Sequence, residues 1–376
     1  MTWAVYLFWV SALLVTYAYV GYPVWLWLRR SWRNEAVKKS DITPSVSIVI
    51  AVHNEAATLP RKLRNLSELH YPQHLLEIIV VSDGSADETE QLLKAAASPA
   101  VRPLLLSDHR GKAVALNQGI AAARGEIVVF MDARQEIEAD AIAMLVRSFA
   151  DFGVGCVSGE LMLKGLTEAG GQEGLGFYWR IEKAIRKMES ETGSVVGATG
   201  ALYAARRELL AQIPQGMLLD DVYLPLCIAA KNKRVVFEPE ARVWDEMPHD
   251  LVKEFRRKVR TLTGNYQLVE LAPWLLSGAN PLRFQFISHK LLRLLVPFAL
   301  ATLLASSSFL HGPAYRTALV LQVCFYASAA VAVCHAPLGL ITRLSKTALA
   351  FLLLNLAAVL AFVNFVFGKR AVWVRP

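Results

Sequence analysis

The sequence predicts an α/β domain with a mixed, mainly parallel sheet, joined to about four transmembrane helices. Two observations carry this prediction. Of the 376 residues, 54% are apolar and the mean hydropathy is +0.35, but the apolar residues are concentrated in long uncharged runs near the two ends. Between these runs, short β-branched stretches alternate with helical ones, a pattern typical of a Rossmann-like sheet covered by helices on both faces.

Four uncharged apolar runs predict the membrane-spanning part, at residues 2–28, 294–310, 317–342 and 347–368. A spanning helix needs about 20 mainly apolar residues. The second run reaches that length only if its helix starts near Ile287, with Lys290 and Arg293 extending to the interface. The first run lacks a preceding charged region and a small-residue cleavage site, so an anchor fits better than a cleaved signal peptide. We expect a transmembrane helix over 1–29, the α/β domain over 40–282 and three further transmembrane helices over 287–368.

Basic residues next to the apolar runs predict the orientation. Against a single Glu35, the first run is followed by Arg29, Arg30, Arg33, Lys38 and Lys39. By the positive-inside rule the α/β domain is then cytoplasmic, in a protein integral to a membrane that we expect to be a bacterial inner membrane. The basic C-terminus conflicts with an even number of spans, which leaves a re-entrant C-terminal segment as an alternative; it carries Lys369, Arg370 and Arg375.

The net charge of +8 does not require a nucleic-acid partner. Much of the excess flanks the apolar runs, where attraction to anionic lipid headgroups accounts for it, so we expect membrane lipid as a partner and no nucleic acid. The four cysteines show no paired spacing, which argues against a zinc site or a disulfide framework.

Within the α/β domain, strands are expected at 46–52, 77–81, 104–106 and 126–131, with helices over 54–66, from about 87, and over 112–123. Later strands at 155–160, 201–205 and 234–238 are less regular. Polar residues follow three of the strands: Asn54-Glu55, Asp83-Gly84-Ser85 and Asp132-Ala133-Arg134. Ligands of open α/β sheets bind at the carboxyl ends of strands, so this set predicts a binding site. Taken singly, these residues are also ordinary turn and N-cap residues.

Six segments resemble the membrane-bound family 2 glycosyltransferases, in order and with normal spacing between residues 45 and 267: SIVIAVHNE, VVSDGSADET, GKAVALNQGI, VVFMDAR, GATGALY and LDDV. That family has a GT-A fold and includes polysaccharide synthases and transferases with lipid-linked acceptors. The resemblance implies an inverting transfer from a nucleotide-sugar donor, with UDP-sugars favoured, to a glycan or lipid-linked acceptor. The reaction would take place at the cytoplasmic membrane face, in polysaccharide or glycolipid synthesis.

The resemblance assigns Glu55 and Asp83 to the base and ribose of the donor, where carboxylates accept hydroxyl or N–H hydrogens. Lys112, in a Gly-Lys pair before a helix, is placed for diphosphate, although a solvated surface lysine is the alternative. Asp132 matches the first Asp of the family's DxD motif, which binds a divalent metal, Mg²⁺ or Mn²⁺. Arg134 replaces the second Asp and binds phosphate or carboxylate instead of metal, which leaves the metal requirement open.

The same resemblance places the catalytic base at Asp221, with Asp220 as a neighbouring charge that raises the pKa of its partner. Both residues are otherwise N-cap candidates. Gly200, in GATGALY, is expected on the acceptor side. The processive Q-x-x-R-W motif is altered, because Arg260 keeps the Arg while Thr261 replaces the Trp. This change leaves polymer synthesis open, with Trp244 as a substitute acceptor platform.

Two functions of other classes stay as alternatives. A channel or transporter component is disfavoured because the predicted spans hold almost no internal charge. A transferase-like membrane protein without activity is suggested by Arg134 and by the altered Q-x-x-R-W segment. The sugar, the acceptor and the number of additions depend on pocket shape, which the sequence does not disclose.

Overall fold

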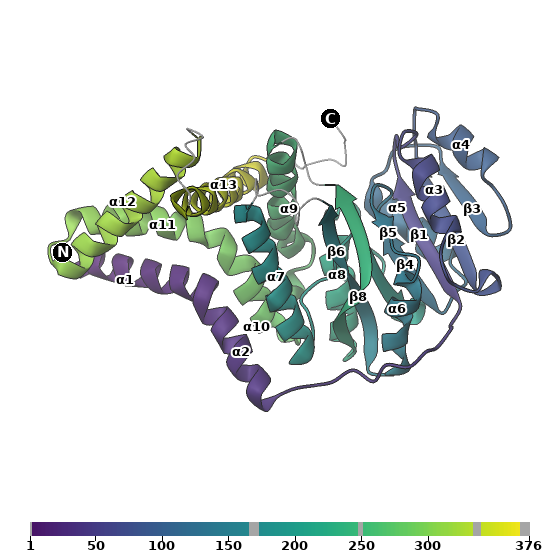
Figure 1. Cartoon of the computed structure of the whole chain (residues 1–376), viewed down its shortest axis with the longest axis horizontal. Helices are drawn as coiled ribbons and strands as arrows, with labels where there is room; N and C mark the ends of the chain where they lie inside the picture. Colours follow the sequence, from purple (N-terminus) through teal and green to yellow (C-terminus); the bar gives the residue numbers. More distant parts are fainter. Residues whose placement is uncertain (1, 165–172, 247–250, 334–339, 369–376) are drawn as a thin grey trace.

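The computed structural model describes residues 2–164, 173–246, 251–333 and 340–368 (Figure 1). Its strands are β1 (Val46–Val52), β2 (Leu76–Asp83), β3 (Val101–Leu106), β4 (Ile127–Met131), β5 (Glu136–Ile137), β6 (Val154–Lys164), β7 (Leu202–Arg206) and β8 (Arg234–Glu246). The helices of the α/β domain are α3 (Leu59–Ser67), α4 (Thr89–Ala95), α5 (Lys112–Ala122), α6 (Ala141–Arg147), α7 (Glu173–Glu191), α8 (Asp220–Ala230) and α9 (Leu251–Leu271). The remaining helices are α1 (Thr2–Thr16), α2 (Tyr22–Trp32), α10 (Arg283–Phe286), α11 (Leu292–Phe309), α12 (Pro313–Val333) and α13 (Leu340–Val366).

Within the described residues, eight strands form one sheet in the order β3-β2-β1-β4-β7-β6-β8-β5. β1 is parallel to β2 and β4, β2 to β3, and β6 to β8, whereas β7 is antiparallel to both β4 and β6. The expected mixed, mainly parallel sheet is therefore confirmed. Sequence reasoning missed β5, which pairs two residues antiparallel with β8 and is too short to produce a periodic pattern.

The strands expected to end at residues 160 and 238 extend to Lys164 and Glu246, and one predicted helix start is wrong. The helix expected from residue 54 begins at Leu59, because Asn54 adopts a left-handed backbone conformation with φ 54°. Asn tolerates this conformation when its side chain is bonded locally. Here Asn54 Oδ1 accepts the backbone N–H of Ala86 at 2.8 Å, and the backbone N–H of Asn54 donates to Ser85 Oγ at 3.1 Å. The residue thus joins the loops after β1 and β2.

Alternating side chains of β1 enter two cores on opposite faces of the sheet. Val49 and Ala51 pack with α5 and α8 on one face, while Ile48 and Ile50 pack with α3 and α6 on the other. Strands buried on both faces explain why the sequence shows continuous apolar runs instead of alternation.

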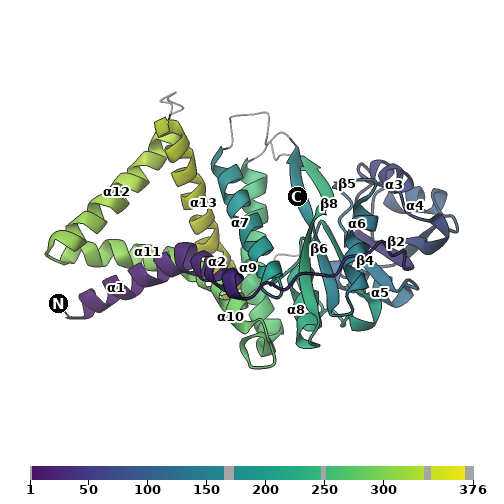
Figure 2. The ribbon, with the colours of Figure 1, turned by 60° about the horizontal axis from the view of Figure 1, so that its bottom comes forward.

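Four helical segments are long and apolar enough to cross a membrane within the described residues: Trp3–Trp32, Arg283–Phe309, Pro313–Ala332 and Leu344–Val366. The second is long enough because its helix starts at Arg283, a few residues before the expected Ile287. The basic C-terminal residues Lys369, Arg370 and Arg375 lie outside the described residues. In Figures 1 and 2, α7 and α9 stand between the sheet and these four segments.

Candidate active site

The carboxyl ends of β1, β2 and β4 meet at one edge of the sheet, because these strands are parallel neighbours. His53 and His109 stack there with ring centroids 4.0 Å apart, and His53 Nδ1 lies 2.8 Å from the carbonyl oxygen of Asp83. Glu55 is buried, and its carboxylate accepts a hydrogen bond from the Thr58 hydroxyl. The ends of β1 and β2 are therefore in contact through His53 and Asp83, and the binding site expected at the three strand ends stays a prediction.

Asp83 organises the loop that leads to Lys112. Its fully buried carboxylate accepts the backbone N–H groups of Arg110 at 2.9 Å and Gly111 at 2.7 Å, and it lies 2.9 Å from His109 Nδ1. Gly111 has φ 94°, a conformation that favours glycine, and it immediately precedes α5. Asp83 thus fixes where α5 begins, and the ribose contact expected of it stays a prediction.

Lys112 lies at the centre of an ionic cluster that we call the catalytic cluster: Lys112, Asp132, Asp220 and Asp221. Lys112 Nζ donates to Asp132 Oδ1 at 3.1 Å and lies 3.3 Å from Asp220 Oδ1. The Tyr203 hydroxyl also donates to Asp220, at 3.4 Å. The alternative of a solvated surface lysine is wrong, because Lys112 is paired with two carboxylates and its side chain is 24% exposed.

The carboxylates of this cluster differ in proton affinity. Desolvation and the neighbouring Asp220 raise the pKa of Asp221 to about 6, against the opposing charges of Lys112 and Lys290. For Asp132, desolvation is outweighed by Lys112, Arg134 and Arg260, which hold its pKa below the usual range. Asp221 is therefore the group best suited to take up a proton near neutral pH.

Gly200 contacts Asp221 directly. Its backbone N–H donates to Asp221 Oδ2 at 3.0 Å, and a Cβ at this position would lie 3.0 Å from that same oxygen. The backbone N–H of Ala198 donates to the Asp221 carbonyl oxygen at 2.7 Å. The GATGALY segment therefore holds the candidate base, and the acceptor contact expected of Gly200 stays a prediction.

Arg134 is held by a buried carboxylate that sequence reasoning did not identify. Its NH2 group donates to Asp245 Oδ2 at 2.5 Å, Gln135 Nε2 donates to the same oxygen at 3.1 Å, and Arg257 NH1 lies 3.8 Å from it. Trp244 occupies the preceding position of β8, so it faces the other side of the strand. Its indole N–H donates to Glu138 at 2.9 Å, and no contact found among the described residues joins it to Asp221.

At the carboxyl ends of the strands, a divalent metal ion fits only with Asp132 as its protein ligand. The described residues contain no group of three His, Cys, Asp or Glu side chains that could hold a metal ion. Asp132 offers one half-exposed carboxylate, and Mg²⁺ uses one or two protein carboxylates together with phosphate and water. Asp132 with a donor diphosphate therefore suits such an ion, whereas the Arg134 position does not contribute a ligand.

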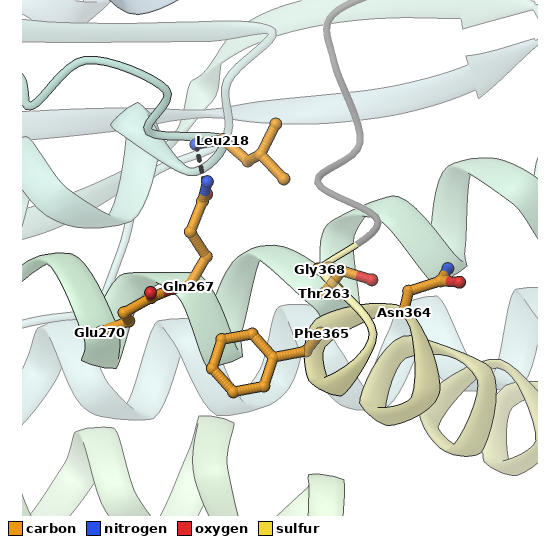
Figure 3. A pocket seen from close by; sticks show the side chains of 7 residues that line it. All are labelled: Leu218, Thr263, Gln267, Glu270, Asn364, Phe365 and Gly368. Carbon is orange, nitrogen blue, oxygen red and sulfur yellow. Dashed lines mark hydrogen bonds between the residues drawn. The ribbon is translucent and has the colours of Figure 1, made fainter.

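A cavity of about 190 Å³ lies between α9 and the end of α13, beside the segment that leads into α8 (Figure 3). Gln267 closes one side, because its Oε1 accepts the backbone N–H of Leu218 at 3.1 Å and its Nε2 donates to the carbonyl of Gly216 at 2.8 Å. The lining residues are Leu218, Thr263, Gln267, Glu270, Asn364, Phe365 and Gly368. The cavity thus lies where the α/β domain meets a membrane-spanning segment.

Sequence reasoning missed three residues of this region: His109, Asp245 and Lys290. His109 carried a weak signal, because it stands three residues before Lys112 in a loop of predicted function. Asp245 and Lys290 carried no such signal in the sequence, because each acts on a residue far away in the chain: Asp245 on Arg134, and Lys290 on Asp221.

Comparison with known proteins agrees with this geometry. The model of glycosyl transferase family 2 matches residues 47–213, ending just before Asp220 and Asp221. The poly-β-1,6-N-acetyl-D-glucosamine synthase of Staphylococcus aureus (strain COL) is 25% identical over 255 residues, which cover 65% of this chain and 61% of that protein. The corresponding synthase of Staphylococcus epidermidis is 25% identical over 229 residues, covering 60% and 55%. The chain therefore spans about three fifths of the length of these relatives.

Among solved structures, the mannosyltransferase PcManGT from Pyrobaculum calidifontis, in complex with GDP-Man and Mn²⁺, matches with a TM-score of 0.71 and 25% identity. The match covers 96% of this chain and 99% of that one, so the likeness includes the apolar helices as well as the sheet. These likenesses support an enzyme over the channel and inactive-protein alternatives. Residues 47–213 therefore match glycosyl transferase family 2, and the sheet with its helices has a GT-A fold.

Proposed function

We propose that the enzyme transfers a sugar, with inversion, from a nucleotide-sugar donor to a glycan or lipid-linked acceptor, in polysaccharide or glycolipid synthesis. The observation that carries this proposal is the catalytic cluster. It places one carboxylate of raised pKa, Asp221, under the positive charge of Lys112, which also pairs with Asp132. A base and a cation for the leaving group are the two elements that a single displacement requires.

The donor lies across the strand ends in this proposal. Glu55 and Asp83 form the base and ribose region, and Lys112, Arg134 and Arg260 surround the diphosphate. The effect of Arg134 and Arg260 on the pKa of Asp132 supports this, because it shows that both positive charges act at Asp132. UDP-sugars are the favoured donors, and GDP-mannose, present in the matched mannosyltransferase structure, is the alternative.

In the reaction, an acceptor hydroxyl oxygen attacks the anomeric carbon from the side opposite the diphosphate. The bond between that carbon and the diphosphate oxygen breaks, and the hydroxyl proton passes to Asp221. Lys112 and Arg260 stabilise the negative charge that develops on the departing nucleoside diphosphate. Asp220 keeps the proton affinity of Asp221 high enough for this transfer. A divalent ion held by Asp132 and the diphosphate would supply further charge stabilisation.

The acceptor approaches from the membrane side in this proposal. The cavity of Figure 3 supports it, because Leu218 stands two residues before Asp220 and the opposite wall belongs to α13. Thr263, Gln267 and Glu270 follow Arg260 on one side of α9, at helical spacing. The names of the relatives indicate a glycan product. The basic residues after the first span support a cytoplasmic position of the site.

A donor screen tests this proposal. Purified full-length protein in detergent is incubated with UDP- and GDP-sugars, with Mg²⁺, Mn²⁺ or EDTA, and nucleoside diphosphate release and product size are measured. We expect release from one donor class, stimulated by a divalent ion, and incorporation of sugar into a lipid or glycan fraction. A product ladder would indicate repeated addition. Turnover of none of the donors under any of these conditions would contradict the proposal.

A further inference from the structure

The strongest unexplained feature is a buried ionic cluster where α7 meets the membrane-spanning segments. We call it the junction cluster: Tyr22, Glu182, Glu189, His289 and Arg293. Glu182 is 7% exposed, whereas Glu189 and His289 are each 2% exposed and Tyr22 is 1% exposed. Ionisable groups inside or beside apolar spans are rare, and they mark function by default.

His289 lies between the two glutamates of α7. Its Nδ1 donates to Glu189 Oε1 at 2.9 Å, and its Nε2 lies 3.0 Å from Glu182 Oε1, an ion-pair contact outside hydrogen-bond angles. The Tyr22 hydroxyl donates to Glu189 Oε1 at 2.5 Å, and Arg293 NH1 donates to Glu182 Oε2 at 2.9 Å. Each ring nitrogen of His289 thus faces a carboxylate oxygen, and the ring bridges Glu182 and Glu189.

Two irregular helical turns bring these groups together. Residues Tyr17–Gly21 of the first span and Ile287–Leu291 of the second are π-helical, and Tyr17 and Ser288 hydroxyls are hydrogen-bonded at 2.8 Å. Such turns insert one residue and redirect side chains, and they occur frequently at functional sites. Here the second turn contains both His289 and Lys290.

The junction cluster continues into the segment that holds Asp221. Glu189 belongs to the last turn of α7, and residues 192–201 follow directly. Glu189 Oε2 also accepts the backbone N–H of Val196 at 3.5 Å. Two residues later, Ala198 donates to the Asp221 carbonyl, and Gly200 donates to the Asp221 carboxylate. A short path of contacts therefore runs from a membrane-spanning helix to the candidate base.

Anchoring alone does not explain these charges. Apolar residues of similar volume hold helices together as well as a buried ion pair does, or better, because the charges need not be desolvated. What a buried ionic group adds is a defined geometry, and a defined geometry at the end of α7 determines where Asp221 is held. Lys290, in the same π-helical turn as His289, also links the two regions, because its positive charge lowers the pKa of the Asp221 carboxyl.

We propose that His289 and Glu189 are positioning residues for the reaction, which set the place of Asp221 through the segment 192–201. The inference rests on the proposed role of Asp221 as base. It makes the second membrane-spanning segment a part of the catalytic apparatus as well as an anchor.

The test separates turnover from donor binding. His289→Gln and Glu189→Gln are compared with the unaltered enzyme for kcat at saturating donor, for donor Kd by direct titration, and for melting temperature in detergent. We expect kcat to fall about tenfold to a hundredfold, the loss typical of a misplaced catalytic group. Donor Kd should stay within about twofold, because the donor region lies at the strand ends.

Tyr17→Phe is the matched control, because it removes a hydrogen bond between the same two π-helical turns without touching Glu189. Its kcat should equal that of the unaltered enzyme. Tyr22→Phe, which removes only one hydroxyl from Glu189, keeps the test valid if the other variants fold poorly; we expect a kcat several-fold lower. Normal kcat in Tyr22→Phe and in every variant that folds would overturn the proposal and leave the cluster as an anchor. If Asp221→Asn also kept full activity, the role of the base itself would be wrong, which is a separate outcome.

Discussion

The catalytic cluster and the junction cluster are both buried and both ionic, but they balance charge differently. In the catalytic cluster one lysine faces three carboxylates, and Asp221 is left with its pKa raised to about 6. In the junction cluster His289 and Arg293 face Glu182 and Glu189. Despite desolvation, His289 and its neighbours lower the pKa of both glutamates, so these stay ionised.

This difference in charge balance distinguishes a cluster suited to proton transfer from a cluster suited to holding other residues in place. An excess of negative charge leaves one carboxylate able to accept a proton near neutral pH, which a general base requires. Carboxylates that each face basic groups have no such freedom, and their contacts fix geometry instead. Substitutions in both clusters should therefore lower kcat, but only those in the junction cluster should also lower the stability of the fold.

The largest effect is expected from Asp221→Asn. An amide cannot take up the acceptor proton, so kcat should fall by roughly 10²–10⁴, the usual contribution of a general base. The melting temperature should not fall, since the change removes one of two adjacent like charges. Nucleoside diphosphate release and differential scanning fluorimetry measure the two quantities. The control is Asp41→Asn, whose side chain is 92% exposed; full activity of Asp221→Asn would identify a different base.

A stability effect comes next, from Glu182→Gln. The amide removes the carboxylate that accepts from Arg293 and that lies beside His289 Nε2, while Glu189 still faces His289 Nδ1. Removing one partner of a buried ion pair costs about 3 kcal/mol or more. We therefore expect a clear fall in the midpoint of thermal unfolding in detergent. Glu240→Gln is the matched control, because this glutamate pairs with Arg147 at the surface and is 60% exposed. Equal midpoints for the two variants would show that the junction cluster contributes no stability.

A smaller effect concerns the pH dependence of turnover. The acidic limb of kcat should have its midpoint near the pKa of Asp221, about 6. Activity is lost as the pH falls through this value, because the protonated carboxyl no longer accepts a proton. The limb belongs to Asp220 and Asp221 together, as interacting groups titrate as a pair. A flat profile between pH 5 and pH 8, measured by initial rates, would argue against Asp221 as base.

The smallest expected effect concerns Lys290, which lies beside the junction cluster and acts on Asp221 of the catalytic cluster. Lys290→Met removes a positive charge that lowers the pKa of Asp221, so the acidic limb should move to higher pH. The expected displacement is less than about one pH unit, since a partly screened charge changes the pKa of a neighbouring carboxyl only modestly. The same pH series measures it, with Lys253→Met of α9 as a control. A limb that moves to lower pH would contradict the electrostatic link between the clusters.

Much of the architecture could be predicted from local pattern. Continuous apolar strands at 46–52 and 126–131 predicted a sheet buried on both faces, and four uncharged runs predicted four candidate spans. Parallel pairing then brings polar strand ends to one edge, which is why Glu55, Asp83 and Asp132 were found as a set. The helix expected from residue 54 was wrong because a turn residue, Asn54, looked like a helix start.

The sequence by itself determined the fold class, the candidate spans and all four side chains of the catalytic cluster. Only the tertiary structure decided which partners surround those side chains. Arg134 is bound by Asp245, 111 residues away, and the pKa of Asp221 depends on Lys112 and Lys290 from two other helices. The reason is physical. Periodicity and turn chemistry act between near neighbours in the chain, whereas charge interaction and desolvation depend on distances in space that the folded chain alone sets.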